Sequence, residues 1–489
     1  MNTLAALRRA IAFDDGRAVP RASLRHYHLT DAPLVVCLCT VAGEPFAPWC
    51  LVFGTDPDHP TGSVVIAEPR DRTQRYRGLA AFAEGLCDYL SGHLAYDMVR
   101  NPLSGVEHPV TAGAPQIVVP TASVAEALIR VAGVGLRKVK GVPPVSHWCN
   151  AHLTWLGQRL ETDGQALILP AATALTFHWA TGQGVMEDAN LPSVLEWLTS
   201  TKPTRDGRLA DIAAAEQQAW GDQRDPARDH GLMLRVDRHN KADNAADREE
   251  ARQAIADEVL PPMLAAYRGC FQALDLLRTL PEAPTAAERW TADKRAWAQH
   301  AKRCDAPTPP LFTVRDRPSQ AVSNAAALET ARARFTAQPV HDDPLILAEA
   351  ISAGDAFTGE VLATDTTNME IKPEGSRRTK VPLLTIRCRL RPASGDGHDH
   401  AQVWWVVSGR PVSGETRHVT PAARRDTDLP YDEPHTVLIA LLSGHDHGRR
   451  TPAVGTTVTF TRLDPRPSNA IRPVIATPWP FIPDTPTSP

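Results

Sequence analysis

The sequence lacks the features that would place it in a membrane or an oxidising compartment. It has no apolar run of about 18 residues, the length that indicates a transmembrane helix. Its eight cysteines are scattered without a Cys-x-x-Cys pair, which argues against a zinc ribbon or a disulfide scaffold. Residues 1–15 contain neither an apolar segment nor a small-residue cleavage site, so we expect no signal peptide. These absences predict a cytoplasmic protein.

An excess of charge of one sign is also missing, and so is a phosphate-binding loop. Lys and Arg total 52 against 56 Asp and Glu, a formal net charge of −4. Bulk positive charge, which drives non-specific binding to nucleic acid, is therefore excluded. A glycine-containing turn precedes Arg137, Lys138 and Lys140, but no Gly-Lys-Ser/Thr follows. We expect no NTPase and no cofactor, and the basic turn is either a secondary phosphate contact or a solvated turn.

Proline, by contrast, is abundant. The 43 prolines among 489 residues are roughly 9% of the chain, against about 5% in typical usage. Short elements and loops should therefore dominate, while hydrophobic (43%) and charged (22%) fractions are ordinary for a globular protein. The length favours about three domains. We predict a multidomain fold with a mixed α/β domain, a helical middle and a small β-barrel.

The N-terminal α/β domain is predicted over residues 1–200. Apolar runs indicate strands at 34–41, 49–53, 63–67, 116–120 and 145–148. Helical periodicity indicates helices at 75–90, 123–131 and 153–160. The resulting order is three strands, a helix, and then alternating strands and helices.

This order resembles the ribonuclease H-like fold over about residues 30 to 165. The resemblance implies carboxylates that converge on two metal ions, because Mg²⁺ prefers oxygen ligands. The first predicted strand contains Val35, Val36 and Cys37 but no Asp, and no acidic residue stands at 119–121. Only Glu84, on the predicted helix, could serve as a ligand. We therefore expect an inactive domain.

A polar stretch at 201–240 predicts a linker around Pro226. The helical pattern at 245–280 contains Pro261 and Pro262, which should break or kink it. Further helices are predicted at 287–304 and 325–335. Residues 241–345 are accordingly expected to form a helical domain.

From about residue 355 the hydrophobic period becomes 2, which indicates strands. Five strands are predicted, at 359–364, 381–391, 402–408, 436–442 and 456–462, with a long loop at 413–434. Such spacing favours a small closed barrel over 346–470. The runs FTGEVLATD and VGTTVTFTRLD resemble the first and last strands of an OB-fold, which implies a nucleic-acid-binding barrel. The tail, 471–489, is proline-rich and could dock on a protein partner or pack back on the barrel.

The candidate nucleic-acid-binding residues centre on Arg387, Arg389 and Arg391. In a strand they share one face at roughly 6.6 Å intervals, a spacing that suits consecutive phosphates. Trp404 and Trp405 point to opposite faces, so one of them should be exposed near the arginines and stack on bases. The alternative is a solvated strand face. The other candidates are basic: Arg377, Arg378, Lys380 and Arg410, with a secondary patch at Arg449 and Arg450.

Three weaker patterns suggest metal or nucleophile chemistry. His398-Asp399-His400 and His445-Asp446-His447 could ligate a metal, although two hydrophilic turns explain them as well. Asp365, or Asp355, with Glu370 and Lys372 has the order of a restriction-type nuclease site. Cys149 and His152 could form a nucleophile or metal pair, but a packed core cysteine is favoured. We expect no resident metal.

Our leading hypothesis is a non-enzymatic subunit that binds single-stranded DNA or RNA, or a strand end. It would act with a protein partner in DNA maintenance, replication or defence. One alternative is a metal-dependent nuclease that uses Asp365, Glu370 and Lys372, or a site around Glu84. The other is a scaffold subunit that binds only proteins.

Overall fold

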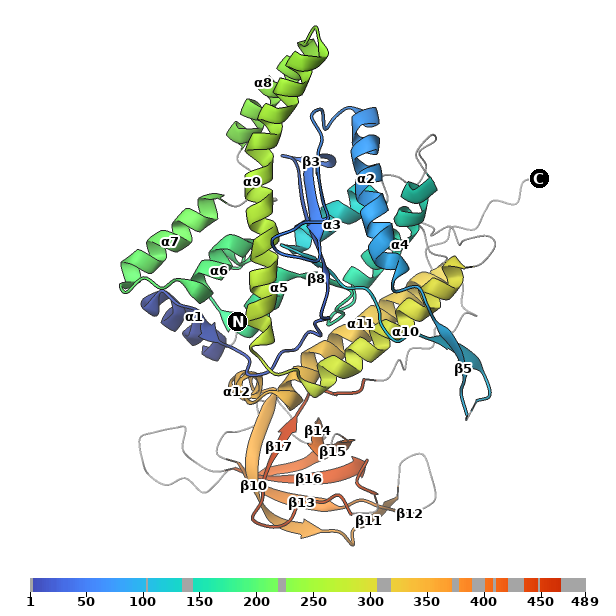
Figure 1. The fold of residues 1–489 in the computed structure, drawn as a ribbon. Helices are drawn as coiled ribbons and strands as arrows, with labels where there is room; N and C mark the ends of the chain where they lie inside the picture. Colours follow the sequence, from blue (N-terminus) through green and yellow to red (C-terminus); the bar gives the residue numbers. More distant parts are fainter. Residues whose placement is uncertain are drawn as a thin grey trace, which may run out of the picture. The chain divides into compact units, whose positions relative to one another are not determined.

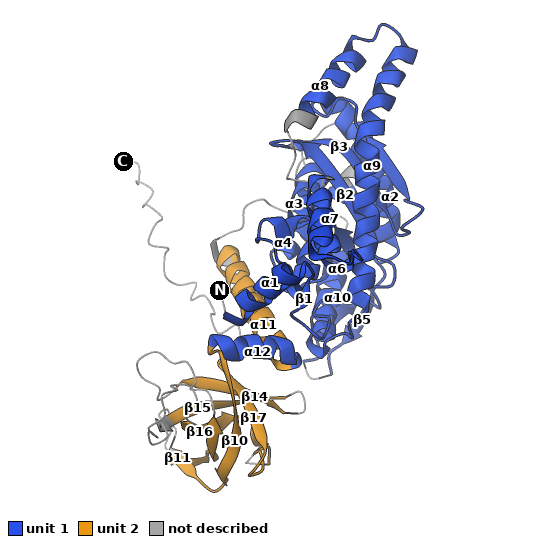
Figure 2. Cartoon of the chain, turned by 90° about the vertical axis from the view of Figure 1, so that its left-hand side faces the viewer, with its two compact units in different colours: residues 1–312, 342–353 blue, residues 313–341, 354–489 orange. Residues whose placement is uncertain are grey.

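The computed structural model describes residues 3–102, 104–133, 144–218, 226–305, 318–371, 378–388, 401–407, 410–420, 435–446 and 449–467. The chain divides into two compact units, Met1–Phe312 with Asp342–Ala353, and Thr313–His341 with Gly354–Pro489 (Figure 2). The predicted fold class is confirmed in outline: a mixed N-terminal sheet, a helical middle and a C-terminal β-barrel. Among the described residues, no helix has both the length and the apolar character needed to span a bilayer.

A five-stranded mixed sheet organises the first unit (Figure 1). Its strands are β2 (Leu34–Val41), β3 (Glu44–Gly54), β4 (Gly62–Val65), β7 (Ile117–Val119) and β8 (Ile168–Pro170). The order across the sheet is β4-β3-β2-β7-β8. β2, β3 and β4 are antiparallel, whereas β7 runs parallel to β2 and β8 parallel to β7.

Both faces of this sheet are covered by helices, so every residue of β2 is buried. On one face, Val36 and Leu38 belong to a core shared with α2 (Arg72–Ser91) and α4 (Pro144–Leu160). On the other face, Cys37 lies against Cys270 of the long helix α9 (Ala245–Arg278). The continuous apolar run of β2 reflects this double burial.

The remaining elements of the first unit surround the sheet. Its helices are α1 (Thr3–Asp15), α3 (Ala122–Leu128), α5 (Ala171–His178), α6 (Leu191–Thr199), α7 (Arg205–Gln218), α8 (Pro226–Lys241), α10 (Pro284–Cys304) and α12 (Pro344–Ala353). Short helical turns occupy Ile129–Gly133 and Glu187–Ala189. Two separate two-stranded sheets pair β1 (Val19–Pro20) with β9 (Trp179–Ala180) and β5 (Asp97–Arg100) with β6 (Glu107–Val110).

Several sequence-based expectations for this unit were wrong. The run at 145–148, predicted as a strand, begins α4, and the fifth strand is β8. A short apolar run is compatible with either a strand or a buried helix, and here packing selects the helix. The polar stretch predicted as a linker carries α7 and α8. α9 continues through Pro261 and Pro262, because buried Val259 and Met263 hold it on both sides of the prolines.

The second unit contains a closed antiparallel barrel and the helix α11 (Pro318–Asp342), whose last residue belongs to the first unit. The barrel strands are β10 (Ala356–Asp365), β13 (Leu383–Cys388), β14 (Gln402–Val407), β15 (Arg410–Thr420), β16 (His435–Ser443) and β17 (Thr457–Thr461). Around the barrel they follow the order β10-β13-β16-β15-β14-β17. A separate hairpin joins β11 (Met369–Ile371) to β12 (Arg378–Lys380).

The barrel has six strands rather than the five predicted. β15 occupies residues 410–420, which overlap the predicted loop at 413–434. Its alternation is weak because Gly414 takes an inward position, where a side chain would meet Ile439. Because many residues of β15 have small or charged side chains, the sequence pattern did not reveal this strand, which the barrel requires for closure.

One glycine in the barrel is set by close packing. A Cβ atom on Gly359 of β10 would lie 2.5 Å from Ile386 Cγ2 and 2.6 Å from the Arg387 carbonyl oxygen. We predict that Gly359→Ala destabilises the barrel by about 1–3 kcal/mol, the usual cost of overpacking. Hydrogen–deuterium exchange of peptides covering β10 and β13 measures this as faster exchange.

Gly231 in α8 provides the matched control, because a Cβ there has nothing within 4 Å. Gly231→Ala should stabilise its helix by about 0.5–1 kcal/mol and leave exchange in the barrel unchanged. Equal exchange in the Gly359→Ala and wild-type barrels would contradict the packing argument.

Candidate functional site

The two tryptophans of β14 point to opposite sides of the barrel wall, as their alternation predicts. Trp405 packs against the barrel core, with its ring centroid 6.3 Å from that of Phe460. Trp404 therefore faces outward, and it is partly exposed. It pairs with Ser413 of β15 on one side and with Thr461 of β17 on the other.

Arg387 lies on the opposite side of the barrel from Trp404. β13, which carries Arg387, is three strands away from β14 in either direction around the barrel. Arg387 is exposed and lies 3.9 Å from Glu360 of β10, an ion pair in which both side chains remain about half exposed. The predicted groove, with an exposed tryptophan beside Arg387, is therefore not formed by these two residues.

Three other predicted arginines lie where β15 begins and β16 ends, and β15 is a neighbour of the strand that carries Trp404. Ser413, the partner of Trp404, pairs with Ser443 of β16, and their hydroxyl oxygens are 2.6 Å apart. Arg410 begins β15 three residues before Ser413, and a Cβ on Gly444 would come 2.4 Å from the carbonyl oxygen of Pro411. The loop that starts at Gly444 thus lies against the start of β15.

The same loop supplies the other two arginines. Arg450 donates from Nη1 to the Gly444 carbonyl oxygen at 3.2 Å, and Arg449 is exposed next to it. We call Trp404, Arg410, Arg449 and Arg450 the Trp404 surface. Its outward indole is on β14, Arg410 is the first residue of β15 on the face that carries Val412, and Arg449 and Arg450 belong to the loop after β16. Asp446, exposed in the same loop, is its nearest acidic neighbour in sequence.

Two further basic candidates lie on a different element. Arg378 and Lys380 lie on β12, in the hairpin with β11. Several other candidates lie outside the described residues: Arg377, Arg389, Arg391, Arg137, Lys138, Lys140, Lys372, His398, Asp399, His400 and His447.

Two of the candidate carboxylates of a nuclease site form local contacts. Asp365 accepts hydrogen bonds from the side chain and backbone of Thr367, and these bonds lower its pKa. Glu370 lies 3.1 Å from Arg417. Glu84 is exposed, on the side of α2 away from the buried Phe82. Within the described part of the chain, none of the three carboxylates belongs to a group of three or more potential metal ligands.

A group with metal-ligand chemistry occurs elsewhere, around His152 of α4. His152 Nδ1 and His300 Nε2 are 2.9 Å apart, and Cys304 Sγ lies 3.7 Å from the same His300 nitrogen. One ligand atom from each residue lies within 4.8 Å of the other two. Both histidines are fully buried, and Cys304 is partly exposed at the end of α10.

Three tryptophans, at positions 148, 155 and 297, surround these imidazoles. The Trp155 ring stacks on His300 at a centroid distance of 4.4 Å. Burial lowers the pKa of His152 to about 4 and that of His300 to about 2, so both rings are neutral near pH 7. Burial likewise raises the pKa of the Cys304 thiol to about 11.

Cys149, the sequence-based partner of His152, contacts a different residue. It hydrogen-bonds to Cys87 of α2, and this bond together with burial raises the pKa of the Cys149 thiol well above its usual value. The expectation of a packed core cysteine therefore describes its environment. His300 and Cys304 were missed by sequence analysis, although their spacing of four residues on a helix places them on one face.

A second buried polar group surrounds Asp343, where the chain re-enters the first unit. Its carboxylate accepts hydrogen bonds from the backbone N–H groups of Ser23 (2.6 Å), Leu24 (2.7 Å) and Leu345 (2.9 Å). His26 Nε2 lies 3.4 Å away. Burial acts to raise the pKa of Asp343, but these donors outweigh it and the pKa is lowered.

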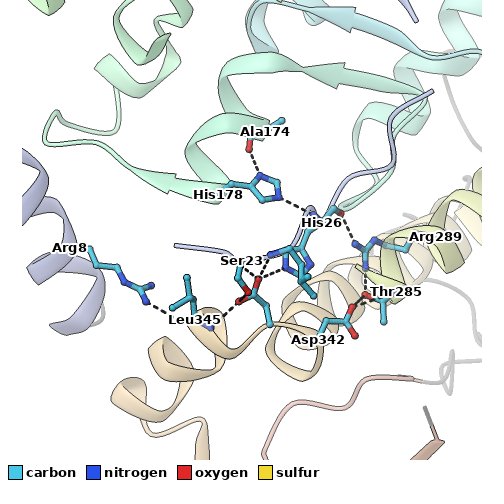
Figure 3. Close-up of polar contacts among 11 residues, drawn as sticks. Arg8, Ser23, His26, Ala174, His178, Thr285, Arg289, Asp342 and Leu345 are labelled. Carbon is cyan, nitrogen blue, oxygen red and sulfur yellow. Dashed lines mark hydrogen bonds and ion pairs between the residues drawn. The ribbon is translucent and has the colours of Figure 1, made fainter. Parts of the chain in front are cut away.

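His178 of α5 extends this network. Its Nε2 accepts a hydrogen bond from the backbone N–H of His26 at 2.9 Å, and its Nδ1 donates to the Ala174 carbonyl oxygen at 2.6 Å (Figure 3). On the other side, Arg289 donates to the His26 carbonyl oxygen at 2.7 Å. The group therefore joins the N-terminal segment to α5, α10 and α12.

The Asp343 group does not have the geometry of a Ser-His-Asp catalytic triad. In such a triad the histidine lies between serine and aspartate and removes the serine proton. Here Ser23 Oγ donates directly to Asp343 Oδ1 at 3.1 Å. The carboxylate occupies the middle position, so Ser23 has no base, and the arrangement holds backbone segments together.

The buried His178 predicts acid sensitivity of the first unit. Burial lowers its pKa to about 3, against about 6.5 in an unfolded chain. The unfolded state then binds a proton that the folded state does not bind, so stability is full above about pH 6.5 and falls as the pH decreases towards about 3. At about pH 5 the loss from this residue is about 2 kcal/mol.

We predict that His178→Gln reduces the decrease of the thermal unfolding midpoint between about pH 7 and about pH 5. His59→Gln is the matched control, because the His59 side chain is 85% exposed. It should leave the pH dependence as in the wild type. Identical pH slopes for all three proteins would contradict the assignment.

Comparisons with known proteins supply no relative: no protein-family model, curated protein or solved structure matches the chain.

Proposed function

We propose that the chain binds single-stranded nucleic acid, or a strand end, at the Trp404 surface and does not cleave it. The observation that carries this proposal is the partly exposed, outward-facing indole of Trp404 on a closed barrel. Arg410 begins the neighbouring strand β15, and the loop that carries Arg449 and Arg450 lies against that end of β15. Proteins that bind single strands combine a basic track along the phosphates with aromatic rings on which bases stack. The Trp404 surface offers both.

The resemblance of the first and last barrel strands to an OB-fold supports this assignment, because OB-folds bind single strands on their barrel wall. The closed antiparallel barrel is compatible with it, with a sixth strand as the difference. The formal net charge of −4 limits the electrostatic contribution from the whole chain. Tight binding would then need a partner, as in a subunit of a replication, DNA-maintenance or defence assembly.

The N-terminal sheet supports a function without cleavage. Three antiparallel strands, a helix and two further parallel strands follow one another in the order that the ribonuclease H-like resemblance implies. In that family metal-binding carboxylates perform the chemistry, yet β2 contains no acidic residue and is buried throughout. A two-metal site needs several converging carboxylates. This unit would thus act as a binding or assembly module.

The first test is fluorescence anisotropy with labelled single-stranded DNA, duplex DNA and RNA, from about 50 to about 300 mM salt. Trp404→Ala should weaken single-strand binding by about 5- to 100-fold, the effect of losing one stacked base. Arg410→Ala and Arg449→Ala should each reduce the salt slope by about one.

Arg387→Ala is the matched control, because Arg387 lies across the barrel and is paired with Glu360. It should retain the wild-type affinity. A loss confined to Arg387→Ala would move the binding surface to β13. Oligonucleotide cleaved with Mg²⁺ and protected by EDTA would establish a nuclease instead, and no binding at the lowest salt would leave a protein-only scaffold.

A further inference from the structure

In the buried cluster of His152, His300 and Cys304, two side chains approach the same ring nitrogen. His300 Nε2 is approached by both His152 Nδ1 (2.9 Å) and Cys304 Sγ (3.7 Å). A ring nitrogen carries either one proton or one lone pair, which is directed along a single line. It therefore makes one good hydrogen bond and cannot serve both neighbours equally. A metal ion would accept one lone pair from each of the three residues.

The cluster also leaves a buried polar atom unsatisfied. His152 Nε2 has no hydrogen-bond partner among the described residues, although the side chain is fully buried. Burying an unsatisfied nitrogen is costly, and Nε2 stays unpartnered whichever group Nδ1 binds, so two imidazoles are held here at a cost to stability. A histidine pair kept only for packing would more simply be apolar. The close grouping of two imidazoles and a thiol therefore indicates that these side chains bind a ligand.

The position of the three residues suits a metal that joins two helices. His300 and Cys304 are four residues apart on α10, so they project from one face, and His152 comes from α4. The tryptophan rings at 148, 155 and 297 surround the imidazoles and exclude water. Cys304, the partly exposed member, leaves a route by which an ion can enter.

We propose that His152, His300 and Cys304 form a Zn²⁺ site that joins α4 to α10. Two imidazoles and a thiolate are ligands that Zn²⁺ prefers, whereas Mg²⁺ and Ca²⁺ select oxygen. In tetrahedral zinc sites the ligand atoms are about 3.3–3.8 Å apart, so the two histidines need to separate by only a few tenths of an ångström. On binding, the Cys304 thiol releases its proton to solvent.

Three protein ligands leave a fourth position of the tetrahedron for water or another donor. Bound zinc would stabilise the first unit, since it binds the folded arrangement of α4 and α10 and not the unfolded chain. This proposal is independent of nucleic-acid binding, because the barrel belongs to the other compact unit.

The test uses Co²⁺ as a spectroscopic probe on the full chain, purified without a histidine tag. Tetrahedral Co²⁺ gives strong visible bands, and a cysteine ligand adds a near-ultraviolet sulfur-to-cobalt charge-transfer band. We expect one Co²⁺ per chain with both features, displaced by Zn²⁺. The wild-type chain alone is sufficient for this test. A titration without a saturable charge-transfer band overturns the proposal.

Cys304→Ser identifies the thiolate. It should abolish the charge-transfer band and weaken Co²⁺ binding roughly tenfold or more, since even residues that only orient ligands contribute 10- to 100-fold. Cys87→Ser is the matched control, because Cys87 is a partly buried thiol of the same unit that bonds to Cys149. It should keep both band and affinity. A charge-transfer band that survives Cys304→Ser overturns the assignment.

Discussion

The buried carboxylate of Asp343 anchors the segment with which the chain returns to the first unit. After α10 the chain leaves the first unit, and it returns at Asp342 to complete that unit with α12. A buried carboxylate is tolerated only when its oxygens are fully hydrogen-bonded. Asp343 meets this condition with donors from both the N-terminal segment and α12. Ion pairs of Glu349 with Arg8 and Arg21 strengthen the same junction. Segments from opposite ends of the first unit's sequence are thus held together by one side chain.

Closure of the barrel determines which outward side chains lie near one another. In an open sheet, residues on neighbouring strands can share a broad face, but a closed barrel of six strands turns outward side chains in all directions. Arg387 and Trp404 are therefore separated, although each occupies the outward position that its alternation predicts. The loop after β16 lies against the start of β15 for a simpler reason, because these two consecutive strands pair antiparallel.

What could be predicted from the sequence depended on local periodicity. The apolar run of β2 and the helical stripe of α2 were visible because the pattern directly reflects burial. β15 was missed because its core positions include Gly414, which has no side chain to mark a period. The cluster around His152 was beyond reach for another reason: its partner His300 lies 148 positions away, and only packing of α4 on α10 joins them. Long-range contacts of this kind leave no local pattern.

The composition of β2 bears both on metal chemistry in the first unit and on the nucleic-acid binding proposed for the barrel. Carboxylates that converge without a metal repel one another, and burying them is costly unless the ion is present. A strand that contributes to such a site must therefore carry an acidic residue that is kept solvated or metal-bound, and β2 has none. β2 is covered on its two faces by α9 and by the core shared with α2 and α4. All eight residues of this strand are thus used for packing. Recognition of nucleic acid, as proposed, would then fall to the barrel, whose outward positions remain free of that requirement.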